Sequence, residues 1–205
     1  MTGFNSETIP GVVLAAGRSS RMGQDKATIL LRGITLLDHV IGRLRPQVSH
    51  IAINSDVAPA LPHVPDIIAG KLGPLAGIHA AMTHGQSVAG VTHVATVPVD
   101  TPFFPSDLVS WLSGAIKGET GMAVAASESG PHPVFGLWPV GLADDLSHWM
   151  QADDKRRVRD FLKRHDAAVV RFPLQPTRAT LLDPFFNINT PDDLAEAERW
   201  IAMLT

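Results

Sequence analysis

Apolar runs and amphipathic stretches alternate along the first half of the chain. Runs that are continuously apolar, or that alternate between apolar and polar residues, predict strands over residues 11–16, 49–55 and 92–100. Apolar side chains three and four positions apart predict helices over residues 34–45 and 73–82. Pro46 ends the first of these helices, and Pro74 stands near the start of the second, where its missing N–H group costs nothing.

The second half of the chain continues with strands and helices in a less regular order. Its apolar runs predict strands over residues 121–127, 132–138 and 167–172. Helical spacing predicts four helices, one from an N-cap at Ser106 to about Lys117 and three over residues 139–151, 155–164 and 191–203. The stretch "FFNINT" before the last helix is predicted to be extended, with Thr190 as the helix cap.

Alternating strands and helices favour a parallel sheet with right-handed crossovers and helices on both faces. We therefore expect one domain over residues 1–205, with a three-layer α/β/α architecture and a mostly parallel, Rossmann-like sheet. Ligands bind such sheets at the carboxyl ends of the strands. Three polar features stand there: the loop after the first strand, Asn54 after the second and Asp100 after the third.

The amino-acid composition argues against several classes of function. The 205 residues carry a formal net charge of −3, which argues against nucleic-acid binding and anionic-membrane binding, because both need a basic field. There is no cysteine, so disulfides, thiolate metal sites and cysteine nucleophiles are excluded. The polar N-terminus "MTGFNSETIP" lacks the features of a signal peptide, and no apolar run reaches the length of a membrane span. We expect a soluble cytoplasmic protein.

The loop in "VVLAAGRSSRMGQDK" has the composition of a phosphate-binding loop. It has no Gly-Lys pair, which a Walker loop requires, and the positions of Gly17 and Gly23 break the G-x-G-x-x-G spacing of a dinucleotide site. Backbone N–H groups beside Gly17 can approach phosphate oxygens, and Arg21 and Lys26 can neutralise them. A surface loop with solvated cations is the alternative interpretation.

"LAAGRSSRMGQDK" resembles the signature of the nucleotidyltransferase superfamily. Four further segments, "GPLAGIHAAM", "VPVDTPFF", "HPVFGLW" and "FFNINTPDDL", are similar to the molybdenum cofactor guanylyltransferases (MobA type), and the resemblance runs from about residue 11 to about residue 200. It implies transfer of GMP from GTP to the phosphate of molybdopterin, with release of pyrophosphate. The nucleotide would bind the N-terminal half of the domain and the acceptor the C-terminal half.

The resemblance also implies roles for individual residues. Arg21, Lys26 and Asp100 would be catalytic, and Asp100 would bind Mg²⁺, an ion that takes few protein oxygens beside phosphates and water. The implied nucleotide-binding residues are Leu14, Ala15, Ala16, Gly17, Lys26, Asn54, Asp66, Gly77 and Asp100. The implied acceptor-binding residues are Arg157, Asn187 and Asn189. His132 resembles the family's His-Pro, although a structural role is the alternative for any single histidine.

Because of Ala16, a cytidine nucleotide is an alternative to GTP as the substrate. The guanylyl branch usually reads Leu-Ala-Gly-Gly, whereas the Leu-Ala-Ala-Gly of this chain is usual in the cytidylyltransferases of the same pathway. The later motifs "VDTPF" and "NINTP" resemble the guanylyl branch, so GTP is the predicted substrate. The alternatives are a cytidylyltransferase, a sugar-phosphate nucleotidyltransferase, and a non-catalytic adaptor that binds nucleotide and cofactor. Other cofactor-biosynthesis proteins and molybdoenzyme chaperones are candidate partners.

Overall fold

The computed structural model describes residues 8–16, 25–55, 61–68, 73–152 and 157–204. Within these residues, six strands form a central sheet in the order β4 (Ile51–Asn54), β1 (Gly11–Leu14), β5 (His93–Pro98), β7 (Gly130–Pro139), β6 (Ala123–Ser127) and β8 (Ala168–Arg171). β4, β1 and β5 are parallel, and β6 is parallel to β8. β7 runs antiparallel to both of its neighbours. The sheet is therefore mostly parallel, as the sequence predicts.

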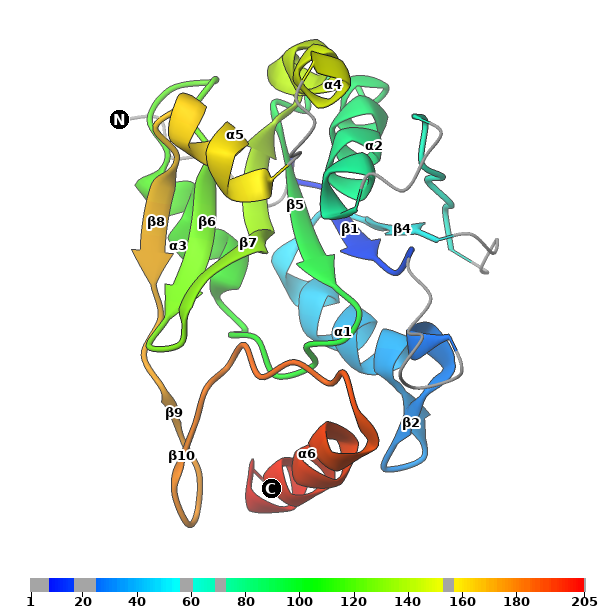
Figure 1. Ribbon diagram of the computed structural model, residues 1–205, viewed down its shortest axis with the longest axis vertical. Helices are drawn as coiled ribbons and strands as arrows, with labels where there is room; N and C mark the ends of the chain where they lie inside the picture. The colour runs from blue at the N-terminus through cyan, green and yellow to red at the C-terminus, as the bar shows by residue number, and fades with distance from the viewer. Residues whose placement is uncertain (1–7, 17–24, 56–60, 69–72, 153–156, 205) are drawn as a thin grey trace.

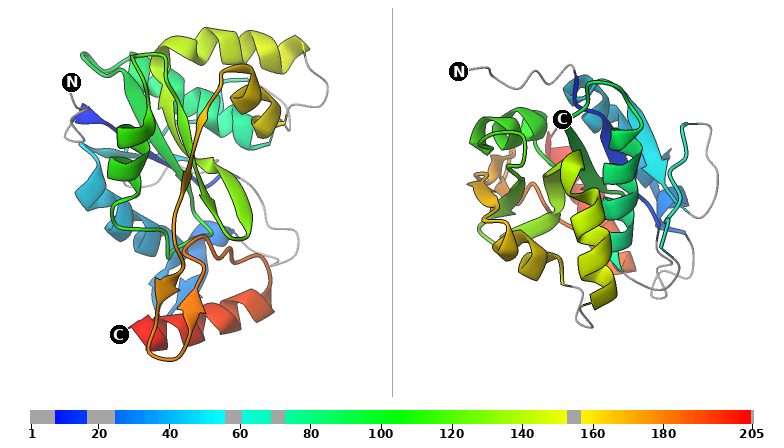
Figure 2. Two further views of the ribbon diagram at one scale, coloured as in Figure 1. Left: turned by 90° about the vertical axis from the view of Figure 1, so that its left-hand side faces the viewer. Right: turned by 90° about the horizontal axis from the view of Figure 1, so that it is seen from above.

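Helices cover both faces of the sheet, which confirms the predicted three-layer architecture (Figures 1 and 2). One face carries α1 (Leu36–Leu44) and α3 (Leu108–Ala115). The other face carries α2 (Pro74–Gln86), α4 (Ala143–Ala152) and α5 (Val158–Arg164). Adjacent strand residues serve the two cores: Val13 packs with α1 and α3, whereas Val12 packs with α2 and α4. This alternation follows from the opposite directions of successive side chains in a strand.

A third, smaller core lies below the sheet, at the end where the strands β1 and β5 terminate (Figure 1). It joins α6 (Pro191–Leu204) to the hairpin of β2 (Leu30–Leu31) and β3 (Ile34–Thr35). A second hairpin, β9 (Gln175–Pro176) with β10 (Leu181–Leu182), lies against α6 in the left view of Figure 2, and Arg178 donates a backbone hydrogen bond to Met203. The short 3₁₀ helices are η2 (Lys26–Thr28), η3 (Arg45–Gln47) and η4 (Val140–Leu142).

Four predicted helix starts are wrong, each for a local reason. The helix predicted from residue 139 begins at Ala143, because Val140–Leu142 form the 3₁₀ helix η4 instead. Ser106 does not cap α3: the N–H of Leu108 bonds to the carbonyl of Pro105, so this segment forms a turn and the helix begins after Asp107. α1 begins at Leu36 because Thr35 is extended and its hydroxyl accepts the N–H of Asp38. α5 begins at Val158 because Arg157 is extended, so Arg157 precedes the helix instead of standing in its first turn. The predicted cap at Thr190 is confirmed, since its hydroxyl accepts the N–H of Asp193.

The buried histidines make the fold sensitive to acid. Burial lowers the pKa of His79, His84 and His93, so the folded protein holds them neutral. As pH falls below the ordinary histidine pKa of about 6.5, the unfolded chain takes up protons that the folded chain does not. The stability that these groups contribute is thus present above about pH 6.5 and is lost as pH falls through their lowered pKa values.

We therefore expect the urea midpoint of unfolding to be lower at about pH 5.5 than at about pH 7.5. The Nδ1 atom of His79 is buried without a hydrogen-bond partner in the described structure, so His79→Leu should flatten this pH dependence. His148 is exposed, and His148→Gln is the matched control that should leave the slope unchanged. A midpoint that rises on acidification would contradict the assignment of neutral buried histidines.

Among the residues that the structure describes, no helix is both long enough and apolar enough to cross a membrane.

Candidate active site

A cavity of about 600 Å³ opens where the strands β1, β4 and β5 end. The hairpin of β6 and β7 and the segment before α6 complete its walls. Its lining residues are Leu14, Ala16, Asn54, Asp66, Gly73, Pro74, Gly77, Pro98, Asp100, Thr101, Ser129, Pro131, His132, Pro133, Val134, Phe135, Phe185 and Asn187. The volume is in the range of sites that hold a nucleotide-sized or cofactor-sized molecule. Residues from both halves of the chain therefore form one site.

The first side of the cavity is organised by Asn54, which is 1% exposed. Its Nδ2 donates to the carbonyl of Val64 at 2.9 Å and to Oδ1 of Asp66 at 2.8 Å. Since both partners only accept hydrogen bonds, the orientation of the amide is fixed, and neither of its hydrogens remains for a base or ribose. Asn54 thus acts here by holding Asp66 at the cavity wall.

Gly77 lets the α2 helix approach this wall closely. A Cβ atom at position 77 would lie 2.6 Å from Oδ1 of Asn54 and 3.1 Å from a methyl group of Leu14. Neither neighbour can move easily, because Asn54 is pinned by two hydrogen bonds and Leu14 ends β1. The glycine is therefore required by the packing of α2 against the site.

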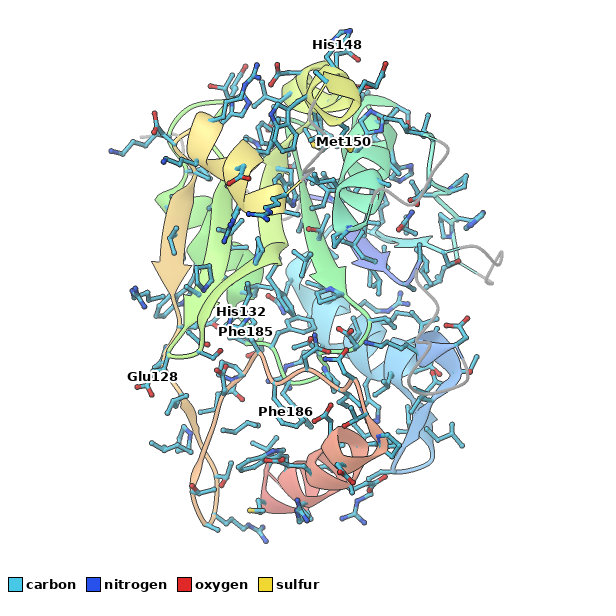
Figure 3. The ribbon with its side chains drawn as sticks, in the orientation of Figure 1. Glu128, His132, His148, Met150, Phe185 and Phe186 are labelled. Atoms are coloured by element: carbon cyan, nitrogen blue, oxygen red, sulfur yellow. The ribbon has the colours of Figure 1, made fainter. Side chains whose placement is uncertain are left out.

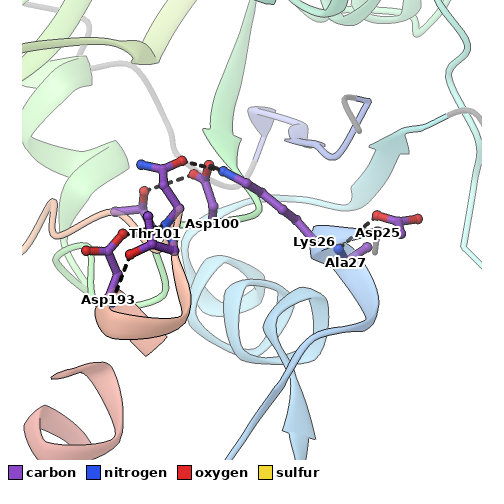
Figure 4. Close-up of polar contacts among 8 residues, drawn as sticks. Asp25, Lys26, Ala27, Asp100, Thr101 and Asp193 are labelled. Atoms are coloured by element: carbon purple, nitrogen blue, oxygen red, sulfur yellow. Dashed lines mark hydrogen bonds and ion pairs between the residues drawn. The ribbon is translucent and has the colours of Figure 1, made fainter. Parts of the chain in front are cut away.

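A charged cluster lies at the edge of the cavity, which Asp100 lines (Figure 4). The Lys26 ammonium lies 2.6 Å from Oδ2 of Asp100 and 2.6 Å from Oδ1 of Asn189. The side chains of Lys26 and Asp100 are each 15% exposed, so water screens the pair only in part. Lys26 lies in η2, Asp100 follows β5 and Asn189 precedes α6, so the fold gathers residues that are up to 163 positions apart.

Local hydrogen bonds hold each member of this cluster. Asp25 caps η2 by accepting the N–H of Ala27 at 3.0 Å, which orients the turn that carries Lys26. Asp193 accepts the N–H groups of Asn189 and Thr190, both at 2.9 Å. Burial acts to raise the pKa of Asp193, but these hydrogen bonds outweigh it, and the pKa lies below its ordinary value. Asp193 thus remains a carboxylate and fixes the backbone at Asn189.

The cluster has the donor chemistry of a divalent cation site. Asp100 and Asn189 each offer an oxygen, and the ammonium between them shows that a positive charge is accommodated at this point. The described residues contain no group of three or more His, Cys, Asp or Glu side chains that could hold a metal alone. Mg²⁺ fits such a site, since it prefers oxygen ligands and commonly takes several of them from phosphates and water.

The opposite side of the cavity is built by the β6–β7 hairpin and the segment before α6. The His132 ring stacks on Phe185 with a centroid distance of 4.4 Å, and both line the cavity together with Asn187. The backbone N–H of Ile188 bonds to the carbonyl of Asp100 at 2.8 Å, which ties this segment to the charged cluster. Phe185 was not among the predicted site residues, although the repeated aromatic residues of "FFNIN" were a usable signal.

The structure places most of the predicted site residues at this cavity, either in its lining or in the charged cluster. Ala15 is buried behind it and donates its N–H to the carbonyl of Asn54 at 2.7 Å. Arg157 is exposed at the start of α5 and is not among the lining residues. Gly17 and Arg21 lie outside the described residues, so their predicted roles remain predictions.

Comparison with known proteins gives the family. The MobA-like NTP transferase domain matches residues 11–169. A molybdenum cofactor guanylyltransferase of Rhizobium leguminosarum is 61% identical over 197 residues, which cover 96% of this chain and 94% of the relative. Another guanylyltransferase of this name, from Rhizobium meliloti, is 54% identical and covers 100% of this chain and 98% of its own.

Solved structures agree in fold. The molybdopterin-guanine dinucleotide biosynthesis protein A of Archaeoglobus fulgidus superposes with a TM-score of 0.67 at 22% identity, over 95% of this chain and 99% of its own. A Mycobacterium tuberculosis protein solved with manganese gives a TM-score of 0.61 at 17% identity, over 94% of this chain and 98% of its own. The family match and the identity to full-length relatives together show that this chain belongs to the MobA-like NTP transferases.

Proposed function

We propose that this enzyme transfers GMP from GTP to the phosphate of molybdopterin, forming molybdopterin guanine dinucleotide and pyrophosphate. The observation that carries the proposal is the contact of Lys26 with Asn189 and with Asp100, a residue that lines the cavity. A transferase needs its charge-neutralising groups where the two substrates meet. The names of the relatives support guanine as the base and molybdopterin as the acceptor.

The reaction requires alignment more than acid–base chemistry. A phosphate oxygen of molybdopterin attacks the α-phosphorus of GTP, a new P–O bond forms, and the bond from that phosphorus to the β-phosphate bridging oxygen breaks. Pyrophosphate leaves with the electron pair. Because a phosphate monoester is already anionic near neutral pH, no strong general base is needed. The main barrier is the repulsion between two anions.

Lys26 is the group we propose to lower that repulsion. Its ammonium is held at the end of a short turn by the cap from Asp25, and it can exchange Asp100 or Asn189 for phosphate oxygens without a change in backbone position. Asp100 and Asn189 are the residues that would hold Mg²⁺. Bound there with the phosphates, Mg²⁺ would neutralise their charge and keep them in line. The manganese bound by a structural relative is consistent with a divalent cation.

We propose that the cavity holds two subsites and that both belong to one domain over residues 1–205. We assign the nucleotide to the side formed by β1, β4 and the start of α2, where Ala16, Asp66 and Gly77 lie. We assign the acceptor to the side formed by the β6–β7 hairpin and the segment that contains Asn187. Gly17 and Arg21 are proposed to complete the phosphate site, and Arg157 to meet the acceptor outside the cavity.

A labelling experiment tests transfer against mere binding. With GTP labelled at the α-phosphate, a transferase places the label in the dinucleotide product, whereas GTP labelled at the γ-phosphate yields labelled pyrophosphate. An adaptor would bind both forms and release neither label. We expect transfer that depends on Mg²⁺ and stops on addition of a chelator. Label that remains in GTP in the presence of Mg²⁺ and molybdopterin would contradict the proposal.

Gly77→Ala should damage the nucleotide subsite. The added methyl group would press on Asn54, which holds Asp66, so we expect KM for GTP to rise about tenfold and the free energy of unfolding to fall by about 1–3 kcal/mol. Gly42 is the matched control, since it is also helical but nothing lies within 4 Å of its Cβ position. Gly42→Ala should leave KM unchanged and stabilise the fold by about 0.5–1 kcal/mol. Equal effects at the two positions would contradict the packing argument.

A further inference from the structure

A chain of polar side chains stands behind the acceptor side of the cavity. The hydroxyl of Ser127, at the end of β6, lies 2.7 Å from Oδ2 of Asp183 and 2.8 Å from Nε2 of His132. Ser127 is 2% exposed, while His132 lines the cavity beside Phe185 (Figure 3). None of the functions assigned above uses Asp183 or Ser127.

The direction of the hydrogen bonds in this chain follows from Asp183. Burial acts to raise the pKa of Asp183, but the hydrogen bonds from the N–H of Phe185 and from the Ser127 and Ser129 hydroxyls outweigh it and lower the pKa. The group is thus a carboxylate, which only accepts hydrogen bonds, so the single hydroxyl hydrogen of Ser127 points to Asp183. At 2.8 Å from Nε2 of His132, the oxygen of Ser127 then accepts the ring hydrogen, and Ser129, whose hydroxyl lies 2.9 Å away, also contacts this oxygen.

This arrangement fixes the tautomer of His132. Burial lowers its pKa, against the opposing effect of Asp183, so the ring is neutral near pH 7 and carries one hydrogen. With that hydrogen on Nε2, Nδ1 is an acceptor, and in the described part of the chain nothing hydrogen-bonds to it. The ring plane is also fixed, because His132 stacks on Phe185 at an interplanar angle of 23°. Asp183 also fixes Phe185, whose backbone N–H donates to Oδ1 of Asp183 at 2.9 Å.

We propose that Asp183 and Ser127 are positioning residues that hold His132 as its Nε2–H tautomer, so that Nδ1 accepts a hydrogen bond from an N–H group on the planar heterocycle of the acceptor substrate. The identity of that heterocycle as the pterin of molybdopterin rests on the proposed function. A flat ring system with N–H donors suits this wall, which presents one stacked aromatic pair and one acceptor atom.

Asp183→Asn tests the assignment with almost no change in shape. The asparagine oxygen must face the N–H of Phe185, which cannot rotate, so the amide NH₂ faces Ser127. The variant is compared with its parent in a Ser129→Ala background, because the Ser129 hydroxyl, 2.9 Å from the Ser127 oxygen, could otherwise accept the Ser127 hydrogen. The Ser127 hydroxyl then turns its hydrogen toward Nε2 of His132, and the ring hydrogen moves to Nδ1. A donor would replace the acceptor in the cavity. We expect ¹⁵N spectra of the imidazole to show Nε2–H in the wild-type protein and Nδ1–H in the variant.

Binding is measured in the same samples by titration, with molybdopterin and with GTP separately. We expect Asp183→Asn to raise the Kd of molybdopterin at least about tenfold and to leave that of GTP unchanged. Asp145→Asn is the matched control: Asp145 contacts a histidine directly, at 2.8 Å from Nε2 of His165, but neither residue lines the cavity. This control should change neither Kd nor the His132 signals.

Each other outcome contradicts part of the proposal. A wild-type spectrum with Nδ1–H, or an unchanged tautomer in Asp183→Asn, overturns the role of Asp183. A switched tautomer with an unchanged Kd for molybdopterin overturns the contact from Nδ1, and a raised Kd for GTP instead would give this wall to the nucleotide. His132→Phe, which keeps the stacking but removes Nδ1, gives the same binding test if the first variant does not fold. Failure of the wild-type protein to transfer GMP would concern the proposed function alone, since neither readout requires turnover.

Discussion

Replacing Lys26 with alanine should lower kcat for GMP transfer by about 10²–10³, the range seen when one preorganised group that stabilises transition-state charge is removed. The Lys26 ammonium is positioned before substrate arrives, by contacts of 2.6 Å to Asp100 and to Asn189. Its loss leaves the developing charge on the phosphates without this partner, and KM should change less than kcat.

The fold should tolerate the Lys26→Ala change. The Lys26 side chain is not part of a hydrophobic core, and Asp100 borders the cavity, where water can replace the ammonium. We expect a shift in the unfolding midpoint close to that of Lys117→Ala. Lys117 is exposed and does not line the cavity, so this variant serves as the control for activity as well. Full activity in Lys26→Ala, measured as pyrophosphate release at saturating substrates, would remove Lys26 from the mechanism.

Asp100→Asn should have the second large effect, a loss of Mg²⁺-dependent transfer by at least about 10² in kcat. The amide keeps the size of the side chain and can still accept the hydrogen bond from Lys26, but it removes the negative charge that we propose attracts the cation. The concentration of Mg²⁺ that gives half-maximal rate should therefore rise. The measurement is the initial rate across a series of Mg²⁺ concentrations at fixed GTP.

A control variant at a second carboxylate distinguishes the loss of a metal ligand from a general change in the charge of the protein. Asp107 precedes α3, its side chain makes no capping hydrogen bond, and it is exposed, so Asp107→Asn should behave as the wild-type protein does. If Asp100→Asn transferred GMP at an unchanged requirement for Mg²⁺, the metal would have to bind elsewhere, and the assignment of Asp100 would be wrong.

The sequence predicted the elements whose burial is periodic. The strand "GVVL" is continuously apolar and α1 has one apolar face, because each packs against a hydrophobic core. These patterns can be read from the sequence without knowledge of the fold. Asp100 and Asn54 were found because polar side chains at the ends of buried strands are conspicuous. The antiparallel direction of β7 was not predicted, since it depends on pairing with β5 and β6 and not on the composition of the strand itself.

The parts of the site that were missed depend on contacts between distant residues. Ser127 and Asp183 are 56 positions apart, and neither belongs to a motif, so only the folded chain reveals that they meet at His132. The amide of Asn54 was predicted to contact the nucleotide; because Val64 and Asp66 engage both of its N–H hydrogens, such a contact would have to use its oxygen. Two-residue strands such as β2 and β9 are too short for a periodic signal.

Nucleotide choice is the most direct test of the central claim. Ala16 lines the cavity on the nucleotide side and matches the cytidylyl pattern, whereas the segments around Asp100 and Asn189 resemble the guanylyl branch. The measurement is pyrophosphate release with Mg²⁺ and molybdopterin, with GTP and CTP compared at equal concentration. We predict release with GTP and little or none with CTP. Release with CTP alone, or with neither nucleotide, would contradict the assignment as a molybdopterin guanylyltransferase.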